Sequence, residues 1–497
     1  MILMKLRKIT ALALALMLCA VLSVPALADE IYEDKVCATV SSGGTETGYS
    51  SFEEAWSRAC ELGNSSEVTF TLRQSWKASG GSFGSGTGFS NGALSYSGAK
   101  MLTLDLNGYC IDRGLSTPVS RGEVICVNSR MTIVDSGSGS YTVSKLFKGG
   151  AIQNGASTTR GGGIIVMDKA ELNFNGGTIL NCVSTDDGGA ISAFGSGAVL
   201  NVNGASFYGN RTYDASGECC GGAIYSNAAT VTVSNAVFEG NYAEDDGGAV
   251  YTYGGSLRVS SSSFYSNSCD ELGGAVCLAG SATAEITDCL FSLNSTAEDH
   301  GGAVCCDSGS GTYLKNCRMY YNSAAKNGGA LYVNADRVFV IGGEYRYNTA
   351  AKNGGGIYVD SMNDINASGK LIVTDNSVNG KANDLCLQDG TASTAYLYCG
   401  GFYEGSSVLL CSTSTSSRLA VKGIDKFQYT NYIGFDEGFS QDKLISSELS
   451  QDNIRAVASA IGGGDIAYVC ACAAAIAVFT VFVIRRGKKK KEAGEYD

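Results

Sequence analysis

Acidic side chains recur just before pairs of glycine residues, and they are the first candidates for chemistry in this chain. The runs are Asp186-Asp187, Glu244-Asp245-Asp246, Asp270-Glu271 and Glu298-Asp299. Carboxylates held close together repel one another, and a hard cation with oxygen ligands would relieve that repulsion, as would solvent and outward splay of the side chains. No EF-hand or nonapeptide calcium pattern is present. The candidate Ca²⁺ ligands are Asp186, Asp187, Asp245, Asp246, Asp270, Glu271 and Asp299.

A second set of residues has the types that bind sugars. Tyrosines stand four residues behind the first glycine of several pairs, with amides or acids two residues further on. Alternate residues of a strand share one side, so these side chains are expected to point outward if the aliphatic residues between them point inward. The predicted ligand strip consists of Tyr225, Tyr251, Tyr332, Asn334, Tyr358 and Asp360. Such a ladder can stack on sugar rings, or it can simply stabilise an exposed sheet.

Histidine and cysteine chemistry is restricted. His300 is the only histidine, and its place in a turn before Gly301 predicts a solvated side chain rather than a member of a catalytic triad. Cys277 and Cys305 share the tyrosine position, whereas Cys289 and Cys317 take positions of small residues and are expected to pack in the core. No zinc-type spacing occurs. The sequence identifies no catalytic residues, and an enzymatic role is the less favoured hypothesis.

The glycine pairs that position these residues form a repeat. They begin at residues 188, 221, 247, 273, 301, 328 and 354, at intervals of 26 to 33 residues. Each unit contains a short aliphatic stretch, a stretch of period-two apolar residues and a third short stretch, with no room for a helix of ten residues. Self-similarity at this period is typical of solenoids. Each unit is therefore predicted to be one three-stranded rung of a parallel β-helix.

The third stretch places a large residue three positions before an asparagine. These pairs are Phe207/Asn210, Phe238/Asn241, Phe264/Asn267, Phe291/Asn294, Met319/Asn322 and Tyr345/Asn348. Equivalent residues of successive rungs lie about 4.8 Å apart. The phenylalanines are thus expected to stack inside, and the asparagine amides to bond to the rungs above and below.

The combination of GGA[IVL] with FxxN resembles the paired repeat of the polymorphic outer membrane proteins of chlamydiae and related β-helical surface proteins. The resemblance covers roughly residues 148 to 385 and implies an all-β, single-stranded, right-handed parallel β-helix of the pectate-lyase-like type. It also implies an association with adhesion. Those proteins end in an outer-membrane barrel, whereas this chain ends in one apolar stretch followed by basic residues.

The two ends carry membrane signals. Lys5, Arg7 and Lys8 precede an apolar run and a small-residue cleavage site, which predicts a signal peptide over residues 1–28. Residues 466–484 are uncharged and at about 1.5 Å per residue can cross a bilayer core of about 30 Å. Since the basic tail follows at once, a type I single-pass topology with an extracellular β-helix is expected. An outer-membrane location is the alternative.

The predicted organisation follows from these signals. It is a signal peptide (1–28), an N-terminal cap with irregular first rungs (29–147), regular rungs (148–411), a C-terminal cap and stalk (412–464), a transmembrane helix (465–485) and a cytoplasmic tail (486–497). Within the cap, "SFEEAWSRACELG" from Ser51 to Gly63 predicts a capping helix with a Ser51/Glu54 capping box. Sixteen of the 19 cysteines lie in the exported part, an even number that permits disulfides without assigning them.

Charge limits the partners. Of 36 Lys and Arg, three lie in the signal and six in the tail, and three of the 48 Asp and Glu lie in the tail, which leaves the exported part near −18. Such a surface repels phosphate backbones, so nucleic acid is excluded as a partner. The favoured function is a membrane-anchored surface protein of adhesin type that binds glycans or proteins of a host or neighbouring cell. The alternative is an extracellular polysaccharide lyase or glycoside hydrolase of the same fold. Apart from Ca²⁺, no cofactor is predicted.

Overall fold

The computed structural model describes residues 36–137, 149–214, 218–307, 311–360, 363–388, 395–412, 419–422, 433–435 and 444–447. The predicted signal peptide, transmembrane segment and basic tail lie outside these residues. Among the described residues, no helix combines the length and the apolar character needed to cross a membrane.

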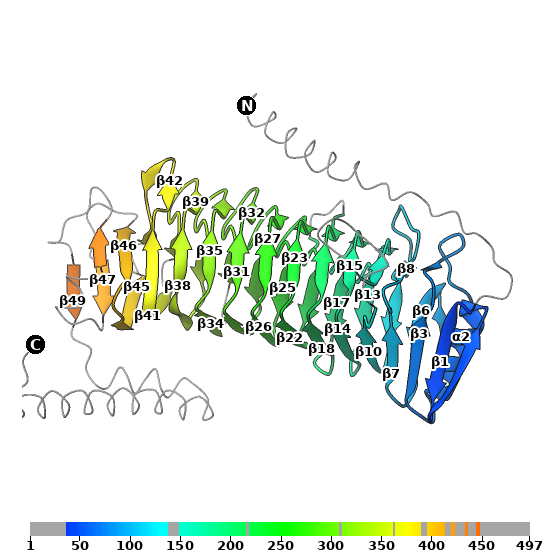
Figure 1. Cartoon of the computed structure of the whole chain (residues 1–497). Helices are drawn as coiled ribbons and strands as arrows, with labels where there is room; N and C mark the ends of the chain where they lie inside the picture. Colours follow the sequence, from blue (N-terminus) through cyan, green and yellow to red (C-terminus); the bar gives the residue numbers. More distant parts are fainter. Residues whose placement is uncertain are drawn as a thin grey trace, which may run out of the picture. The chain divides into compact units, whose positions relative to one another are not determined.

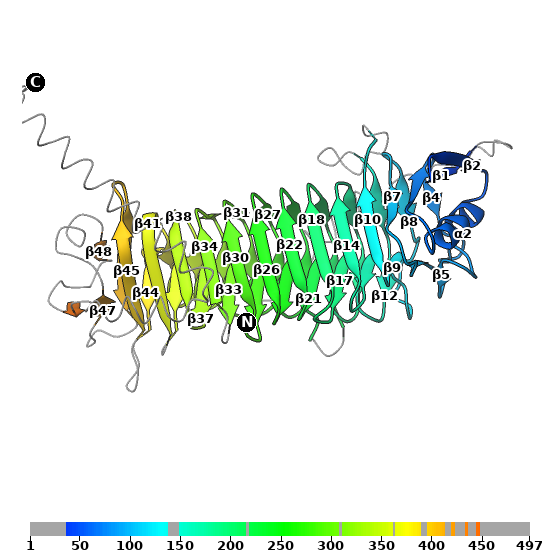
Figure 2. The same cartoon turned by 90° about the horizontal axis from the view of Figure 1, so that it is seen from below.

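One rung shows how the chain is built. Residues 224–243 form four short strands, β21 (Ile224–Asn227), β22 (Thr230–Ser234), β23 (Val237–Glu239) and β24 (Tyr242–Ala243). The sequence predicts three strands per rung, whereas the structure has four. The fourth strand has two residues, directly follows the repeat asparagine (Asn241 in this rung) and pairs in a separate 10-stranded sheet. Each strand pairs in parallel with its equivalent in the next rung, as for β22 and β26 (Ser256–Ser260). The rungs succeed one another in chain order along the solenoid (Figures 1 and 2).

Strands of the four kinds recur along the chain. The first strands are β6 (Ala93–Tyr96), β9 (Ile125–Val127), β13 (Ile164–Val166), β17 (Ile191–Phe194), β21, β25 (Val250–Tyr253), β29 (Val276–Ala279), β33 (Val304–Asp307), β37 (Leu331–Asn334), β40 (Ile357–Val359) and β44 (Leu385–Leu387). The second strands are β3 (Val68–Leu72), β7 (Leu102–Asp105), β10 (Arg130–Val134), β14 (Glu171–Asn175), β18 (Val199–Asn203), β22, β26, β30 (Thr283–Thr287), β34 (Gly311–Lys315), β38 (Val338–Arg346), β41 (Asp364–Thr374) and β45 (Tyr396–Phe402).

Third and fourth strands are shorter. The third strands are β4 (Trp76–Lys77), β8 (Cys110–Asp112), β11 (Ala151–Gln153), β15 (Thr178–Leu180), β19 (Ser206–Tyr208), β23, β27 (Ser263–Tyr265), β31 (Leu290–Ser292) and β35 (Arg318–Tyr320), and the second and third strands merge in β38 and β41. The fourth strands are β12 (Ala156–Ser157), β16 (Val183–Ser184), β20 (Arg211–Thr212), β24, β28 (Ser268–Cys269), β32 (Ser295–Thr296), β36 (Ser323–Ala324), β39 (Thr349–Ala350) and β42 (Ser377–Val378), followed by β43 (Lys381–Ala382).

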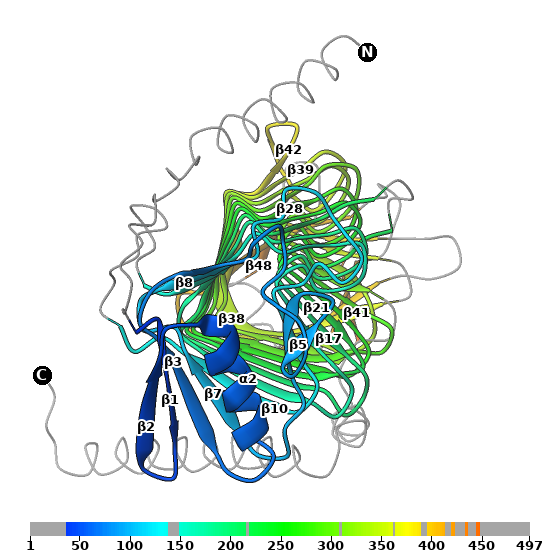
Figure 3. The same cartoon turned by 90° about the vertical axis from the view of Figure 1, so that its right-hand side faces the viewer.

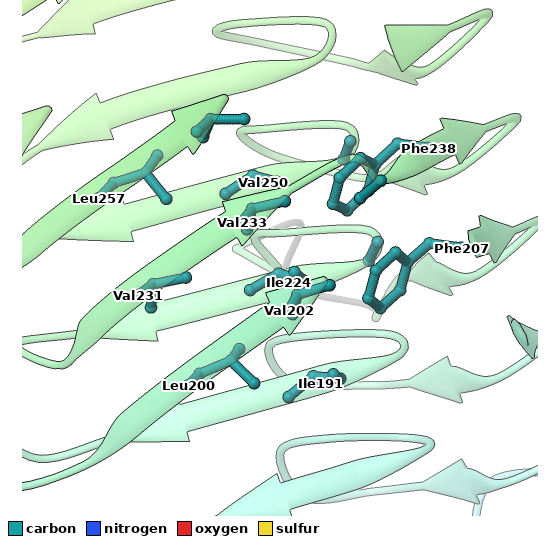
Figure 4. Packing of buried hydrophobic residues seen from close by; sticks show 14 of the residues in the cluster. Ile191, Leu200, Val202, Phe207, Ile224, Val231, Val233, Phe238, Val250 and Leu257 are labelled. Atoms are coloured by element: carbon teal, nitrogen blue, oxygen red, sulfur yellow. The ribbon is translucent and has the colours of Figure 1, made fainter. Parts of the chain in front are cut away.

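A continuous apolar core fills the solenoid. Leu200, Val231 and Leu257 stand in one inward column, and Figure 4 shows them beside Ile191, Ile224 and Val250 of the first strands. The predicted aromatic stack is confirmed, because the rings of Phe207, Phe238, Phe264 and Phe291 lie parallel with centroids 4.6 to 4.7 Å apart. Each ring buries its faces against its neighbours, which stabilises the stack beyond the removal of apolar surface from water.

The predicted asparagine ladder is also confirmed. Asn241 is fully buried; its Oδ1 accepts hydrogen bonds from the backbone N–H and the Nδ2 of Asn210, both at 3.0 Å, and its Nδ2 donates to the oxygen of Phe207 at 3.1 Å. The same pattern runs through Asn267, Asn294, Asn322, Asn348 and Asn376. It ends at the carboxylate of Asp384, which accepts from the backbone N–H and the Nδ2 of Asn376 at 2.7 Å.

The two glycines of a pair meet different requirements. Gly247 has φ of 66°, a left-handed conformation that glycine adopts without steric cost. Gly248 needs space: a Cβ there would lie 2.2 Å from the oxygen of Gly274 in the next rung. Both requirements return in the pairs that begin at residues 188, 221, 273, 301 and 328, so the motif is first of all a packing requirement.

The N-terminal rungs are covered by other elements. The predicted helix is α2 (Phe52–Leu62), and its N-cap Ser51 accepts a hydrogen bond from the N–H of Glu54 at 3.2 Å. It packs on β3 and on β1 (Ala38–Ser42), which pairs antiparallel with β3 and with β2 (Thr45–Tyr49), while β5 (Phe89–Ser90) forms a hairpin with β6. Seen along the stack, α2 lies against the first rungs (Figure 3).

At the other end, parallel pairing continues past the predicted boundary at residue 411. β46 (Ser407–Ser412) pairs with β48 (Ile433–Phe435), and β47 (Leu419–Lys422) pairs with β49 (Leu444–Ser447). Part of the segment predicted to be a cap and stalk thus extends the solenoid.

Candidate functional site

The tyrosines predicted as a ligand strip do form a column. Tyr225 is the register partner of Tyr251, and Tyr332 of Tyr358, with Cys277 and Cys305 in the rungs between them; we call these six residues the outer column. The rings of Tyr225 and Tyr251 are parallel at 5.7 Å, and those of Tyr332 and Tyr358 at 5.8 Å. They lie outside the main core, as the alternation of the strand predicts.

Their predicted exposure is wrong. Tyr225, Tyr332 and Tyr358 are only 6%, 5% and 3% exposed, and Tyr251 is half-buried. The cause is the turn before each glycine pair, which folds back over the first strand; a Cβ on Gly247 would lie 3.0 Å from the Cβ of Tyr251. The outer column is therefore the filling of a second, smaller core.

Hydrogen bonds fix the polar ends of these side chains. The hydroxyl of Tyr332 donates to Oδ2 of Asp360, and that of Tyr358 to Oε1 of Gln388, both at 2.5 Å. Asn334 lies two residues beyond Tyr332 and donates to Asp307 at 2.7 Å. Burial raises the pKa of the Tyr332 hydroxyl. Tyr332, Asn334 and Tyr358 thus already hold hydrogen-bond partners within the fold, and they do not form an open sugar-binding face.

Cysteines complete both cores. Cys277 and Cys305 are fully buried register partners in the second core. Cys289 and Cys317 lie in the main core, as predicted from the small residues at their positions. All sixteen cysteines of the described residues are buried free thiols.

The first acidic turn is neutralised by a base. Arg160 lies 3.8 Å from Oδ1 of Asp186 and 3.5 Å from Oδ2 of Asp187, and its guanidinium also lies over the rings of Phe194 and Tyr225, at 4.8 and 5.7 Å from their centroids. Asp187 accepts the backbone N–H of Cys220 at 3.1 Å. Burial raises the pKa of Asp187 to about 7. This pair needs no cation to relieve its repulsion.

The second acidic turn brings three residues of metal-ligating types together, one thiol and two carboxylates. Single ligand atoms of Cys220, Asp245 and Asp246 all lie within 4.8 Å of one another. The thiol of Cys220 donates to Oδ2 of Asp245 at 3.4 Å, and Oδ1 of Asp246 accepts the N–H of Leu272 at 2.8 Å. Burial raises the pKa of Asp246 to about 8, so protonation also lowers the repulsion. Ca²⁺ takes about six to eight oxygen ligands and a thiol does not suit it; these three residues alone do not fit the predicted site.

The remaining predicted ligands lie outside this group of three, and Glu271 touches it through a side-chain hydrogen bond with Asp245. Glu271 is exposed, and Asp299 lies 2.8 Å from Nε2 of His300 and 2.9 Å from Nζ of Lys326. The predicted solvation of His300 is wrong. Its Nδ1 accepts the N–H of Asn327 at 3.0 Å, and its ring stacks on Tyr332 at 4.3 Å. Burial lowers the pKa of His300, which keeps the imidazole neutral and its Nδ1 lone pair engaged. It is a structural residue, with no free nitrogen to act as a base.

Three large exposed side chains were not predicted from the sequence. Leu293, Tyr321 and Tyr347 each stand directly before a ladder asparagine, and they are 57%, 56% and 44% exposed. Glycines at the same position in earlier rungs, Gly209 and Gly240, were the available signal. A glycine that alternates with large residues in one column indicates a left-handed backbone whose side chain is free to point into solvent.

Comparison with known families agrees with this architecture. The family model described as "Right handed beta helix region" matches residues 221–400. No curated protein and no solved structure matches the chain. The stacked parallel strands and the matched family model together make this part of the chain a right-handed parallel β-helix.

Proposed function

We propose that this chain is an exported, membrane-anchored surface protein of adhesin type, which presents its β-helix to glycans or proteins outside the cell. The apolar run and basic cluster at each end of the sequence support export and a type I anchor. The likeness of its repeats to those of the chlamydial polymorphic outer membrane proteins supports a role at the surface. In this arrangement α2 and the first strands serve as the cap of the solenoid, since an open end would expose its core and unpaired strands.

The observation that carries the proposal is the engagement of the titratable groups along the outer column. His300 accepts a hydrogen bond at Nδ1 and has its Nε2 2.8 Å from Asp299, Asp187 forms an ion pair with Arg160, and Tyr332 donates to Asp360. A general base or acid must reach a substrate proton, and these groups already hold partners within the fold. The described residues therefore build a rigid scaffold whose variation lies in the side chains of its exterior.

Protease protection tests the topology. With a C-terminal epitope tag on the full chain, protease added to intact cells should remove the β-helix and leave the tag on a short membrane fragment. Cells that express the chain should also attach to a host-cell or neighbouring-cell layer better than cells that express a chain lacking residues 149–388. Protection of the β-helix, or equal attachment of both strains, would refute the proposal.

A polysaccharide-cleaving enzyme is the second candidate, because two carboxylic acids have raised pKa values. Burial brings the pKa of Asp187 to about 7 and that of Asp246 to about 8, the range in which a carboxylic acid serves as a general acid. Release of reducing ends or of unsaturated products from a panel of neutral and acidic polysaccharides, abolished by Asp187→Asn or Asp246→Asn, would favour this function over the first.

A further inference from the structure

The position directly before each ladder asparagine forms a column at one corner of the solenoid. It contains Gly209, Gly240, Ser266, Leu293, Tyr321, Tyr347 and Asp375, and every φ in it is positive, from 50° to 65°. Strand register holds the column together; for example, Tyr320 before Tyr321 pairs with Arg346 before Tyr347. We call this set the corner column.

Three consecutive members of the corner column expose large apolar side chains. Leu293, Tyr321 and Tyr347 are 57%, 56% and 44% exposed, whereas the residue after each of them is a fully buried asparagine. The rings of Tyr321 and Tyr347 lie nearly parallel, with centroids 5.2 Å apart and an interplanar angle of 14°. This creates a short aromatic ridge along the solenoid axis.

The fold does not require tyrosine here. A left-handed conformation suits glycine, and Gly209 and Gly240 occupy it in earlier rungs, whereas bulky residues adopt it only at a cost. Tyr321 has φ of 57° and Tyr347 of 58°, and neither side chain fills the core. Strained backbone positions that carry exposed side chains are typical of functional surfaces.

Polar groups flank the ridge on both sides. On one side, Thr349 and Ser323 are exposed, and their hydroxyl oxygens lie 3.2 Å apart in a hydrogen bond. On the other side, Glu344 accepts from the hydroxyl of Tyr320 at 2.6 Å, and Arg346 lies 3.6 Å from Asp375. With Arg318 beside Glu344, two acids and two bases balance, so this patch carries no net charge, unlike the acidic exterior as a whole.

We propose that Leu293, Tyr321 and Tyr347 form the binding surface for an extended, neutral carbohydrate chain. Tyrosine offers a flat apolar ring for the C–H groups of a sugar and a hydroxyl for its oxygen atoms. The flanking hydroxyl, carboxylate and guanidinium groups complete the hydrogen bonding. Rungs repeat about every 4.8 Å, a length close to that of one pyranose unit in an extended glycan, so successive units meet successive rungs.

Size and charge favour this ligand over the other partners of a surface protein. A stable protein interface buries about 800 Å² on each side, far more than three side chains provide. A polyanion gains nothing from a patch without net charge and is repelled by the acidic body. The inference rests on the proposed surface function and names the ligand class and the residues that bind it.

Binding of cellohexaose and chitohexaose to the full chain in detergent micelles tests the inference, with hexagalacturonate as the anionic comparison. We expect the wild-type chain to bind at least one neutral hexasaccharide and not the anionic one. Replacing both tyrosines by the residue of the earlier rungs, in Tyr321→Gly/Tyr347→Gly, should weaken binding at least tenfold without lowering the melting temperature, because glycine relieves the backbone.

Tyr253→Ser is the matched control, since Tyr253 is 51% exposed in a different column. This variant should bind as the wild type does. Equal binding by the double glycine variant, preference for hexagalacturonate, or no binding of either neutral probe would overturn the inference. If cells that carry the double variant still attach, the carbohydrate inference is overturned and the proposed surface function stands. If the β-helix proves to be intracellular, the proposed surface function is refuted.

Discussion

Each ladder asparagine from Asn241 to Asn376 accepts two hydrogen bonds from buried donors of the rung before it. Asn241 supplies one oxygen to two donors of Asn210, and both residues are fully buried. In Asn241→Leu, those two donors lose their acceptor, and each buried unsatisfied group costs about 1–3 kcal/mol. We expect the free energy of unfolding to fall by about 3 kcal/mol, measured by denaturant titration of the purified chain.

Asn201→Leu is the matched control for this change. Asn201 stands on the outside of β18 and is half-buried, and its Nδ2 donates to Asn173 at 2.9 Å in a place that water can reach. Its replacement should cost about 0.5 kcal/mol or less. Similar losses for both variants would contradict the importance of the buried ladder.

Buried carboxylic acids give the chain a pH-dependent stability. The pKa of Asp246 is about 8 and that of Asp187 about 7 in the folded chain, compared with a usual value of 3.8. Between pH 4 and these values the folded state holds more protons than the unfolded state, so stability falls as pH rises. Melting temperatures measured from pH 6 to 9 should decrease and level off above about pH 8.

Asp246→Asn isolates this effect at one position. An amide still accepts the N–H of Leu272, and Asn327 and Asn353 occupy the equivalent position in later rungs. The variant should show a shallower decline and a higher melting temperature than the wild type at pH 9. Asp336→Asn, at an exposed acid, should follow the wild-type curve; an unchanged slope in Asp246→Asn would rule out the explanation.

In the turn that carries the glycine pair, the lack of space for a Cβ restricts the residue type more strongly than the backbone conformation does. A Cβ on Gly248 would lie 2.2 Å from the oxygen of Gly274, and backbone cannot move aside cheaply. Gly248→Ala should therefore lower the free energy of unfolding by about 3 kcal/mol. Gly204 has a positive φ of 66° but no atom within 4 Å of a Cβ, so Gly204→Ala should cost only about 1 kcal/mol. The free energy of unfolding of both variants is measured by thermal or chemical denaturation. Equal losses would show that the positive φ, and not the lack of space, is the reason for glycine at these positions.

The elements of the rung could be predicted from the sequence because they repeat. Period-two apolar residues located the second strands, and the spacing of Phe238 and Asn241 identified the stacked columns. The fold-back of the acidic turn could not be predicted in this way. Alternation tells which side of a strand Tyr332 takes, but it does not tell what packs against that side, and here a turn covers it.

The candidate site was less predictable than the fold for the same reason. The turn position of His300 predicts a solvated side chain, yet Asn327 of the next rung donates to its Nδ1 and Tyr332 of the next rung stacks on its ring. Tyr321 attracts no prediction from the sequence, since nothing in one rung marks its left-handed backbone. Only comparison of the whole column, with Gly209 and Gly240 in it, indicates that its side chain leaves the fold.

Across the whole molecule, each rung touches only its neighbours, so a local defect should stay local. In Asn241→Leu, hydrogen exchange should accelerate in the rungs that carry Asn210 and Asn267 and remain unchanged in those around Asn322 and Asn348. Exchange followed by mass spectrometry of peptides from the full chain measures this. Uniform acceleration from β14 to β41 would instead show that the solenoid opens as a single unit.

The asparagine ladder also has a direction, because every amide oxygen accepts from the rung before it. Any interior rung therefore presents the same donors on one side and the same acceptor on the other. Only the ends differ: Cys182 gives Asn210 its backbone N–H alone, and the carboxylate of Asp384 accepts from Asn376. If one unit of 26 residues were duplicated in phase, its asparagine could form the same hydrogen bonds with the rung before it and with the rung after it. The length of the solenoid can thus change by whole rungs without a change in the bonding of the rungs on either side of the insertion.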